Sequence, residues 1–431
     1  MEKFVIQGGA PLSGELNVAG NKNAALPILA ACLLTEEEVL LHRVPRIRDT
    51  EAQIALLAQL GAEVEWVGDN SVRLCARGVS DSAVDEQLSS QIRASFLLAG
   101  PLLARFGAAS MPPPGGDFIG RRRLDAHLDA FKDLGAEVAG DRWIELTAPK
   151  GLCPCEIFMD EPSVMGTENA LMAAALTPGA TKISNAASEP HVQDLAHLLT
   201  AMGARVDGIG SNVMTVNGRD KLGGAEHRIG PDHIEVGSFM ALAAATGGEL
   251  RIRDAGPAHL AMTRRQFRRL GLRSEIEGED VIVPPGQQLA VEADLGDAIP
   301  KIEDGPWPAF PADLTSIALA LATQAKGEIL IFEKMFENRL FFVDKLVAMG
   351  ARITLCDPHR AIVSGPSRLH GERVESPDIR AGMAMLIAAL AADGKSEIGN
   401  IRQIDRGYEQ IDERLRALGA QIERVPVDGQ P

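Results

Sequence analysis

Three basic side chains stand where a helix normally carries an acid or a polar cap. Lys22, Arg93 and Arg380 each fall at the start of a segment whose following residues are nearly all apolar. The N-terminus of a helix carries partial positive charge and free N–H groups, so a cation there opposes the local preference. An anionic ligand would remove that conflict. These positions therefore indicate an anion-binding site within a chain that is acidic overall.

Asp313 heads another of these apolar segments. An aspartate at a helix start is an ordinary N-cap, and it can also accept a proton from an attacking hydroxyl. For any single cluster, capping explains the polar residues as well as ligand binding does. Because a buried helix cannot easily bury its polar end, the clusters are expected to open into one cleft. The six clusters begin near Asn21, Gln91, Thr167, Glu235, Asp313 and Asp378.

A second sequence motif recurs at the same spacing as the polar clusters. An apolar residue, then Gly and usually Ala, follows helical patterns such as 51–60 and 411–418. The Gly is expected to close the helix in the left-handed conformation. The alternation after it, as at 62–66 and 351–355, predicts a strand with one buried face. The glycines are Gly61, Gly135, Gly203, Gly271, Gly350 and Gly419, so six repeats of about 72 residues account for the chain.

Each repeat is predicted to supply one buried helix, one surface helix and several strands. Segments 24–34 and 383–392 are apolar all round, which is typical of a helix inside the fold. The chain of 431 residues, 45% of them hydrophobic, is long enough for two or three domains with a sizeable core.

Composition limits the classes of function. A net charge of −16 argues against a protein that coats nucleic acid or an anionic membrane. The longest apolar runs reach about a dozen residues, whereas a membrane-spanning helix needs roughly 20. The start lacks an export signal, and five scattered cysteines indicate a reducing cytoplasm. Cys153-Pro-Cys155 has no second pair, the histidines are scattered and nothing resembles a GxGxxG or Walker loop, so neither a metal nor an organic cofactor is expected.

Longer motifs carry a resemblance to a known family. The sequence resembles the bacterial UDP-N-acetylglucosamine enolpyruvyl transferases from about residue 3 to residue 425. Many separate motifs in the right order make the resemblance specific. They lie at 19–27, 93–95, 114–120, 308–313, 336–339, 378–381 and 404–409.

The resemblance implies an architecture that agrees with the sixfold repeat. The fold class is α/β, a two-domain inside-out α/β barrel with buried helices and outer sheets. One three-repeat domain, which carries the catalytic loop, is expected at 22–232. The other combines 1–21 with 233–431, and the active site is expected in the interdomain cleft.

The resemblance also implies a reaction. The enolpyruvyl group of phosphoenolpyruvate passes to the 3-hydroxyl of UDP-N-acetylglucosamine by addition and elimination, with phosphate release. This is the first committed step of peptidoglycan synthesis, on which the cell wall, cell shape and the cell cycle depend. A carboxylate and a phosphate both need cations, and Arg suits them because its planar fork binds in two-pronged fashion. The cationic positions of the family match Lys22, Arg122, Arg339, Arg380 and Arg406, with Arg93 nearby.

Family roles carry over to further positions. Asp313 orients or deprotonates the acceptor hydroxyl, and Asn23 holds the intermediate and the sugar. Asp117 follows the glycines of a loop and stands where most members have Cys; it is the general acid or serves product release. The antibiotic fosfomycin alkylates that Cys, so insensitivity is expected here. Lys22 and Arg406 count as catalytic, and the substrate-binding set is Asn23, Arg93, Arg122, Ser163, Val164, Met335, Arg339 and Arg380.

Some positions associated with the nucleotide-sugar depart from the family pattern. Arg121 with Arg123 would compensate for a Lys replaced by Glu161, or would bind a differently shaped anion. Transfer to another acceptor, such as a nucleotide, and a regulatory nucleotide-sugar-binding paralogue therefore stay open as alternatives. A cytoplasmic monomer or weak oligomer is expected. The departures are Arg123, Glu161, Met165, Ser188, His233 and Ala312.

Overall fold

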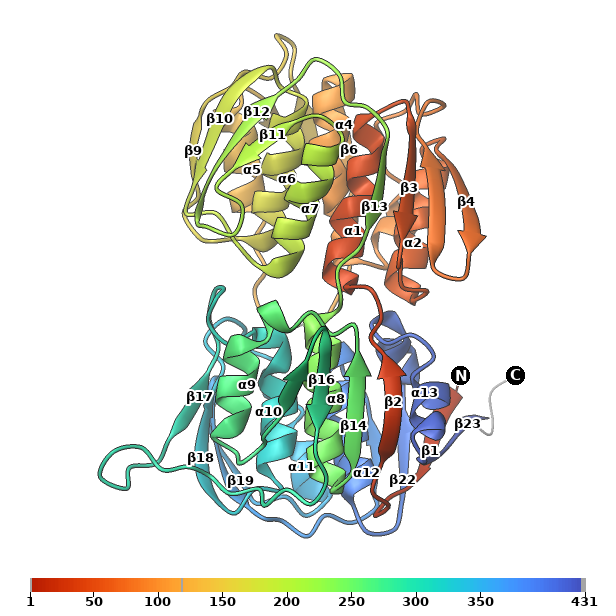
Figure 1. The fold of residues 1–431 in the computed structure, drawn as a ribbon. Coiled ribbons are helices and arrows are strands. Elements are labelled where there is room, and N and C mark those ends of the chain that lie inside the picture. The colour runs from red at the N-terminus through yellow and green to blue at the C-terminus, as the bar shows by residue number, and fades with distance from the viewer. Residues whose placement is uncertain (1, 118, 428–431) are drawn as a thin grey trace. The chain divides into compact units, whose positions relative to one another are not determined.

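Two compact units make up the chain. The computed structural model describes residues 2–117 and 119–427. The N-terminal unit contains residues 20–117 and 122–230, and the C-terminal unit contains residues 2–19, 119–121 and 231–427. Each unit has three sheets and its own hydrophobic core (Figure 1).

One sheet topology is built repeatedly. In the clearest copy, β9 (Glu156–Phe158) runs parallel to β10 (Gly179–Ser184). Two antiparallel strands, β12 (Val213–Gly218) and β11 (Arg205–Asp207), complete the sheet. Parallel neighbours need a crossover connection, and here the buried helix α6 (Val164–Ala175) supplies it. In the described residues five of the six sheets follow this four-strand order and the sixth lacks only the leading strand, so the predicted sixfold repeat and α/β class are confirmed.

In the N-terminal unit, a strand from the end of the sequence pairs with a strand near its beginning. β13 (Ala225–Arg228) runs parallel to β3 (Glu38–His42) and leads the first repeat. β5 (Ser71–Cys75) and β4 (Glu63–Gly68) finish that sheet. The third sheet has strands β6 (Ala108–Met111), β8 (Ile144–Thr147) and β7 (Glu137–Ala139), and its leading strand shrinks to one parallel bridge between Ala83 and Ser110. The helices are α1 (Lys22–Ala31), η1 (Cys32–Leu34), α2 (Arg48–Gln59), α3 (Glu86–Ser89), η2 (Arg93–Leu98), α4 (Ala99–Phe106), α5 (Asp125–Asp133), α6 and α7 (Pro190–Ala201).

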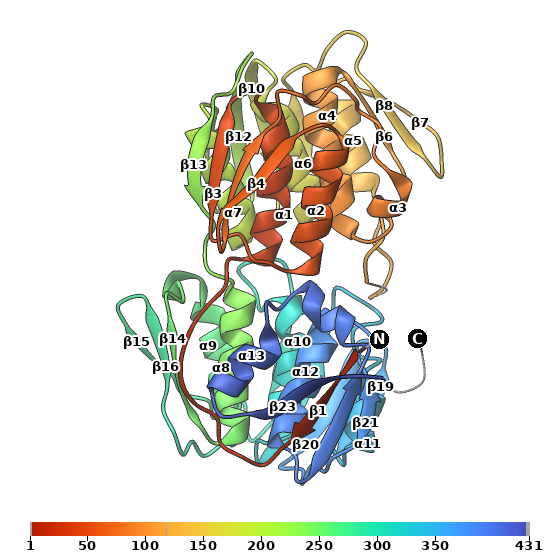
Figure 2. The same ribbon diagram turned by 90° about the vertical axis from the view of Figure 1, so that its right-hand side faces the viewer.

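The C-terminal unit repeats the plan and pairs the two ends of the chain. β1 (Glu2–Gln7) pairs with β22 (Lys395–Gly399) on one side and with β23 (Gln421–Pro426) on the other. Figure 2 shows β1 beside β23. β21 (Arg373–Glu375) leads this sheet. The other two sheets are β2 (Ser13–Asn17), β14 (Glu249–Arg253), β16 (Asp280–Val283) and β15 (Glu275–Glu277), and β17 (Lys301–Glu303), β18 (Gly327–Phe332), β20 (Arg360–Gly365) and β19 (Ile353–Asp357). The helices are α8 (His233–Thr246), η3 (Pro257–His259), α9 (Ala261–Arg268), η4 (Ala312–Leu314), α10 (Thr315–Ala322), α11 (Val343–Ala348), α12 (Ile379–Ala391), η5 (Ile401–Arg406) and α13 (Ile411–Ala417).

The centre of the C-terminal unit is a bundle of three buried helices. α8, α10 and α12 pack on one another, with the sheets outside them (Figure 1). Every residue of α10 is buried, as is α12 up to Leu390. Each fully buried Leu, Ile or Met contributes roughly 1.5–3 kcal/mol. Small residues let the helices approach closely: a Cβ on Gly237 would lie 2.8 Å from Leu314 Cδ1. The expected all-round apolar helices are therefore confirmed as interior elements.

The recurrent glycines close surface helices as predicted. Gly61 follows α2 with φ of +103°, and Gly419 follows α13 with φ of +97°. All six have positive φ, where a side chain would be strained. The strands after them begin two to four residues later, so the predicted helix–glycine–strand order holds.

Two buried helices begin earlier than their polar clusters suggested. α6 starts at Val164, because the Ser163 hydroxyl caps it by accepting from Gly166 N. α8 starts at His233, because Asp232 accepts from the N–H groups of Ile234 and Glu235. The clusters expected at these two helix starts therefore lie inside the first turns. Among residues 2–117 and 119–427, no helix combines the length and apolar character needed to cross a bilayer.

Candidate active site

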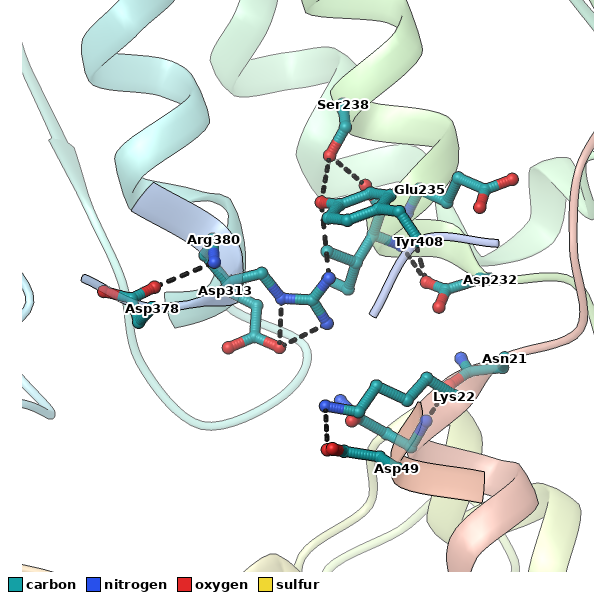
Figure 3. A network of polar contacts seen from close by, with 12 residues as sticks. Asn21, Lys22, Asp49, Asp232, Glu235, Ser238, Asp313, Asp378, Arg380 and Tyr408 are labelled. Carbon is teal, nitrogen blue, oxygen red and sulfur yellow. Dashed lines mark hydrogen bonds and ion pairs between the residues drawn. The ribbon is translucent and has the colours of Figure 1, made fainter. Parts of the chain in front are cut away.

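In the C-terminal unit the carboxylate of Asp313 binds two arginines. Arg339 Nη2 donates to Asp313 Oδ1 at 2.9 Å, and Arg380 donates through Nε and Nη2 to Oδ2 at 3.1 and 2.9 Å. Figure 3 shows the contact between Asp313 and Arg380. The arginine side chains are 3% and 5% exposed, whereas Asp313 is 26% exposed. Three predicted site residues from three separate segments therefore form one cluster, which carries one net positive charge at neutral pH.

Helix capping does not account for Asp313. It lies within η4, whose N-cap position is Pro311, and the N-cap position of α10 is Leu314. Neither position makes a side-chain cap bond. The carboxylate is directed to the arginines instead.

Several groups fix the position of Arg380. Asp378 caps α12 by accepting from the N–H groups of Arg380 and Ala381 at 2.8 and 2.9 Å. The side chain also donates from Nη1 to the Tyr408 hydroxyl at 3.3 Å, which bonds Ser238 Oγ at 3.1 Å (Figure 3). Burial lowers the pKa of Arg380, but Asp313, Tyr408 and Asp232 together outweigh burial, so the pKa is raised. Arg380 is therefore a permanently charged group at the head of a buried helix.

In the N-terminal unit Lys22 is the first residue of α1. Its Nζ lies 2.8 Å from Asp49 Oδ2, and the two side chains are 9% and 5% exposed (Figure 3). Asp49 belongs to the first turn of α2. The cation that opposes the helix dipole is thus balanced by a carboxylate from the next helix. Asn21 caps α1 by accepting from Asn23 N and Ala24 N, so the side chain of Asn23 is not the cap.

Arg93 holds the backbone of a neighbouring segment. Its Nη2 donates to the carbonyl of Arg122 at 2.6 Å and to that of Arg123 at 3.4 Å. Burial, and then the charge of Arg122, lowers the pKa of Arg93 to about 10. Of the two predicted binding residues, Arg93 therefore fixes the chain segment that carries Arg122.

A buried histidine lies next to these arginines. Asn169 accepts from Gly100 N through Oδ1, so its Nδ2 faces the Phe96 carbonyl and His127 Nδ1, the latter at 2.8 Å. His127 Nδ1 is then an acceptor, and the ring proton sits on Nε2. Burial, followed by the charges of Arg93 and Arg122, lowers the pKa of His127 to about 3. The ring is therefore neutral at physiological pH.

The remaining predicted residues are placed separately. Asp117 is half-buried, before the break in the described residues at 118. Arg406 ends η5 half-buried, and its Nη1 donates to Gln403 Oε1 at 2.9 Å. Ser163 and Val164 lie at the start of α6, and Met335, 38% exposed, lies in the turn after β18. Sequence reasoning missed Asp49 and Tyr408 as partners; Tyr408 lies within a motif at 404–409, whereas nothing local marks Asp49.

Two departures from the family pattern are an arginine paired with an aspartate and a buried, neutral histidine. Arg123 is held by Asp125, with Nη2–Oδ1 and Nε–Oδ2 separations of 2.7 and 2.8 Å. His233 packs edge-on against Trp307, and burial, then His259, lowers its pKa to about 3. Arg123 can therefore compensate for Glu161 only if a substrate anion competes with Asp125 for its guanidinium group.

Within 2–117 and 119–427, no set of three or more His, Cys, Asp or Glu side chains could hold a metal ion. All five cysteines lie in this part of the chain, and each is a free thiol.

Comparison with known proteins decides the family. The sequence model described as EPSP synthase (3-phosphoshikimate 1-carboxyvinyltransferase) matches residues 6–415. A UDP-N-acetylglucosamine 1-carboxyvinyltransferase of Bradyrhizobium diazoefficiens is 57% identical over 98% of both chains. One of Treponema denticola is 53% identical over 98% of this chain and 99% of that protein. The chain belongs to the enolpyruvyl transferase family.

Solved structures of enolpyruvyl transferases share the fold. The enolpyruvyl transferase NikO from Streptomyces tendae superimposes with a TM-score of 0.88 and 24% identity over 98% of both chains. EPSP synthase from Acinetobacter baumannii gives a TM-score of 0.76 at 18% identity, over 99% of this chain and all of that one. The predicted two-domain inside-out α/β architecture of the enolpyruvyl transferases is therefore confirmed.

Proposed function

We propose that this chain transfers the enolpyruvyl group of phosphoenolpyruvate to the 3-hydroxyl of UDP-N-acetylglucosamine and releases phosphate, the first committed step of peptidoglycan synthesis. The observation that carries the proposal is the 57% identity to a protein of that name over nearly the whole of both chains. The substrates are two anions, which suit the cationic residues at the heads of the buried helices.

The C-terminal cluster suits the binding of phosphoenolpyruvate and the orientation of the acceptor. Arg339 and Arg380 share the single carboxylate of Asp313, so the three residues retain one positive charge for an anion. Arginine forks bind carboxylate or phosphate in two-pronged fashion. Two arginines hold the Asp313 carboxylate in place, which favours a role in orienting the acceptor hydroxyl and accepting its proton. Arg406 adds a further cation in this proposal.

The N-terminal unit contributes the other half of the machinery in this proposal. Lys22 and Asn23 contact the intermediate, and Arg122 binds substrate from the segment held by Arg93. Ser163, Val164 and Met335 contact the substrates, Met335 from the C-terminal unit. Asp117 donates the proton to the vinyl CH₂ carbon or serves product release, and closure of its loop would exclude water. We propose that both units, with the boundaries expected from the sequence, act on one pair of substrates.

The proposal includes a cellular setting. We propose that the enzyme acts in the cytoplasm, which its free cysteines and its nucleotide-sugar substrate support, and that it is a monomer or weak oligomer. The product then supplies the cell wall.

An acceptor panel tests the proposal. Purified protein is mixed with phosphoenolpyruvate and, separately, UDP-N-acetylglucosamine, UMP or shikimate 3-phosphate, and phosphate release and product mass are followed. Turnover with UDP-N-acetylglucosamine alone is expected, with Asp313→Ala as the inactive control. Turnover with UMP instead would mean that the changes at Glu161, Met165 and Ala312 altered the acceptor. Binding of nucleotide-sugar without phosphate release would indicate the regulatory paralogue.

A further inference from the structure

Next to Arg339, two buried carboxyl groups directly follow two neighbouring strands. β17 and β18 are parallel, with Glu303 opposite Phe332. The next residues in this register are Asp304 and Glu333, so the sheet places the two side by side. Asp304 is 2% exposed and Glu333 is fully buried.

Each carboxyl group has one oxygen satisfied and one without a hydrogen-bond partner. Glu333 Oε1 accepts from Phe336 N at 3.1 Å, and Asp304 Oδ1 accepts from Lys334 N. Glu333 Oε2 and Asp304 Oδ2 have no partner, and neither has Arg339 Nε. Glu333 Oε2 lies 3.8 Å from Arg339 Nε, just beyond a hydrogen bond.

A single proton shared by Glu333 and Asp304 would give both unpartnered carboxyl oxygens a hydrogen bond. Two adjacent buried carboxyl groups cannot both ionise cheaply, and a proton held between them satisfies both bare oxygens. Burial first, and the neighbouring Asp304 as well, raises the pKa of Glu333 to about 8, although Arg339 acts in the opposite direction. Glu333 therefore holds its proton at neutral pH.

The protonation state of Glu333 decides how much charge Arg339 offers. When Glu333 is protonated, the only carboxylate hydrogen-bonded to Arg339 in the described chain is Asp313. When Glu333 ionises, a second carboxylate stands 3.8 Å from Arg339 Nε and competes for the guanidinium. An anionic substrate would then meet a cluster with no net charge.

We propose that Glu333 is a positioning residue: a proton shared with Asp304 keeps its carboxyl group neutral and so keeps the charge of Arg339 available to phosphoenolpyruvate. The inference rests on the proposed function, and Glu333 itself touches no substrate. It predicts that binding of phosphoenolpyruvate weakens as pH rises and Glu333 ionises.

The other charged groups around Glu333 do not replace this role. His359 Nδ1 bonds the backbone carbonyl of Glu333 at 2.7 Å, so it does not face the carboxyl group. Lys334 Nζ lies 2.9 Å from Glu303 Oε2 and is paired there. Thr315 can donate to Glu333 and opposes protonation, as Arg339 does. Asp304 is the neighbour that favours the proton.

Three variants test the inference. Glu333→Gln keeps the acceptor for Phe336 N but cannot ionise, and Asp304→Asn removes the neighbour that favours the proton. Glu328→Gln is the matched control, because Glu328 lies exposed on β18, the strand that ends just before Glu333, and accepts a hydrogen bond from Ser364. Phosphate release is measured from pH 6.5 to 9.5 with phosphoenolpyruvate varied and UDP-N-acetylglucosamine saturating.

The two variants are expected to change the KM for phosphoenolpyruvate at alkaline pH in opposite directions relative to the wild type. The KM for phosphoenolpyruvate of the wild type and of Glu328→Gln rises at alkaline pH, and that of Asp304→Asn rises at a lower pH. The KM of Glu333→Gln stays level, so at pH 9 it is about three- to tenfold below the wild type, with kcat little changed. A wild-type KM profile in Glu333→Gln would overturn the inference.

Thermal melting gives a readout independent of activity. The raised pKa means that the folded state binds a proton which the unfolded state releases above about pH 4.5, so this contribution to stability is lost as pH rises through 8. The Tm of Glu333→Gln is therefore expected to gain on the wild type between pH 5.5 and 8.5. If the wild type releases no phosphate, the proposed function fails. If the Tm difference between the wild type and Glu333→Gln stays constant from pH 5.5 to 8.5, the shared proton is refuted.

Discussion

Arg380 donates two hydrogen bonds to one oxygen of Asp313, from Nε at 3.1 Å and from Nη2 at 2.9 Å to Oδ2. The second oxygen of Asp313 is occupied by Arg339. The carboxylate is thus the common counter-charge of two buried arginines that come from different repeats. Its removal would leave two buried cations without the carboxylate that they share.

Asp313→Asn is expected to lower the free energy of unfolding by about 2–4 kcal/mol, because breaking a buried ion pair leaves uncompensated charge. Partial exposure of Asp313 keeps the loss toward the lower end. Turnover should fall more than the affinity for phosphoenolpyruvate, because the acceptor hydroxyl loses its orienting group. Urea unfolding and steady-state kinetics check both points. Loss of affinity with intact turnover would make Asp313 a binding residue only.

Arg406→Ala should remove most activity and leave the fold stable. Its half-buried side chain donates a hydrogen bond to Gln403, and the proposed role is a charge-assisted contact with substrate. Such a contact is worth about 1.5–3 kcal/mol, or roughly ten- to over a hundredfold in kcat/KM. Arg402→Ala, an exposed arginine of the same short helix, is the control and should keep wild-type kinetics. Near-wild-type turnover of Arg406→Ala would remove this residue from the site.

Fosfomycin should leave this enzyme active. The epoxide alkylates a loop thiolate in the family, and the carboxylate of Asp117 is a far weaker nucleophile. None of the five cysteines lies between Pro112 and Arg123. Asp117→Cys should introduce time-dependent inhibition and a covalent mass increase at that residue. Modification of Asp117 in the wild type would refute this expectation, and inactivation elsewhere would mean that the loop is misassigned.

Acid should destabilise the N-terminal unit through His127. Its pKa is lowered to about 3 in the folded state, chiefly by burial, whereas the unfolded side chain has a pKa near 6.5. The unfolded state therefore binds the extra proton, and each pH unit below about 6.5 costs about 1.4 kcal/mol until the folded pKa is reached. His127→Gln, which retains an acceptor for Asn169, should be less stable than the wild type at pH 7.5 but lose less between pH 6.5 and 5. Parallel acid dependence of the two proteins in urea unfolding would contradict this account.

The repeat, the buried helices and the helix-closing glycines were all predictable from consecutive residues. Gly61 and Gly419 mark a left-handed turn because that conformation is a local property of the backbone. Likewise, the apolar run 383–392 forms an interior helix because its residues offer no polar face. The resemblance to a family added the candidate roles of Asp313, Arg339 and Arg380.

Tertiary structure alone decided which groups meet and which of them are charged. Lys22 pairs with Asp49, and Asp313 binds arginines 26 and 67 residues further along the chain. No local pattern encodes such pairs, because they depend on how segments that are distant in the sequence pack together. The same holds for the proton on Glu333 and for neutral His127: a pKa sums burial and every nearby charge, and these are fixed only when the chain is folded. The sequence by itself determined the repeated architecture and the chemical types of the site residues; packing determined their partners and their protonation.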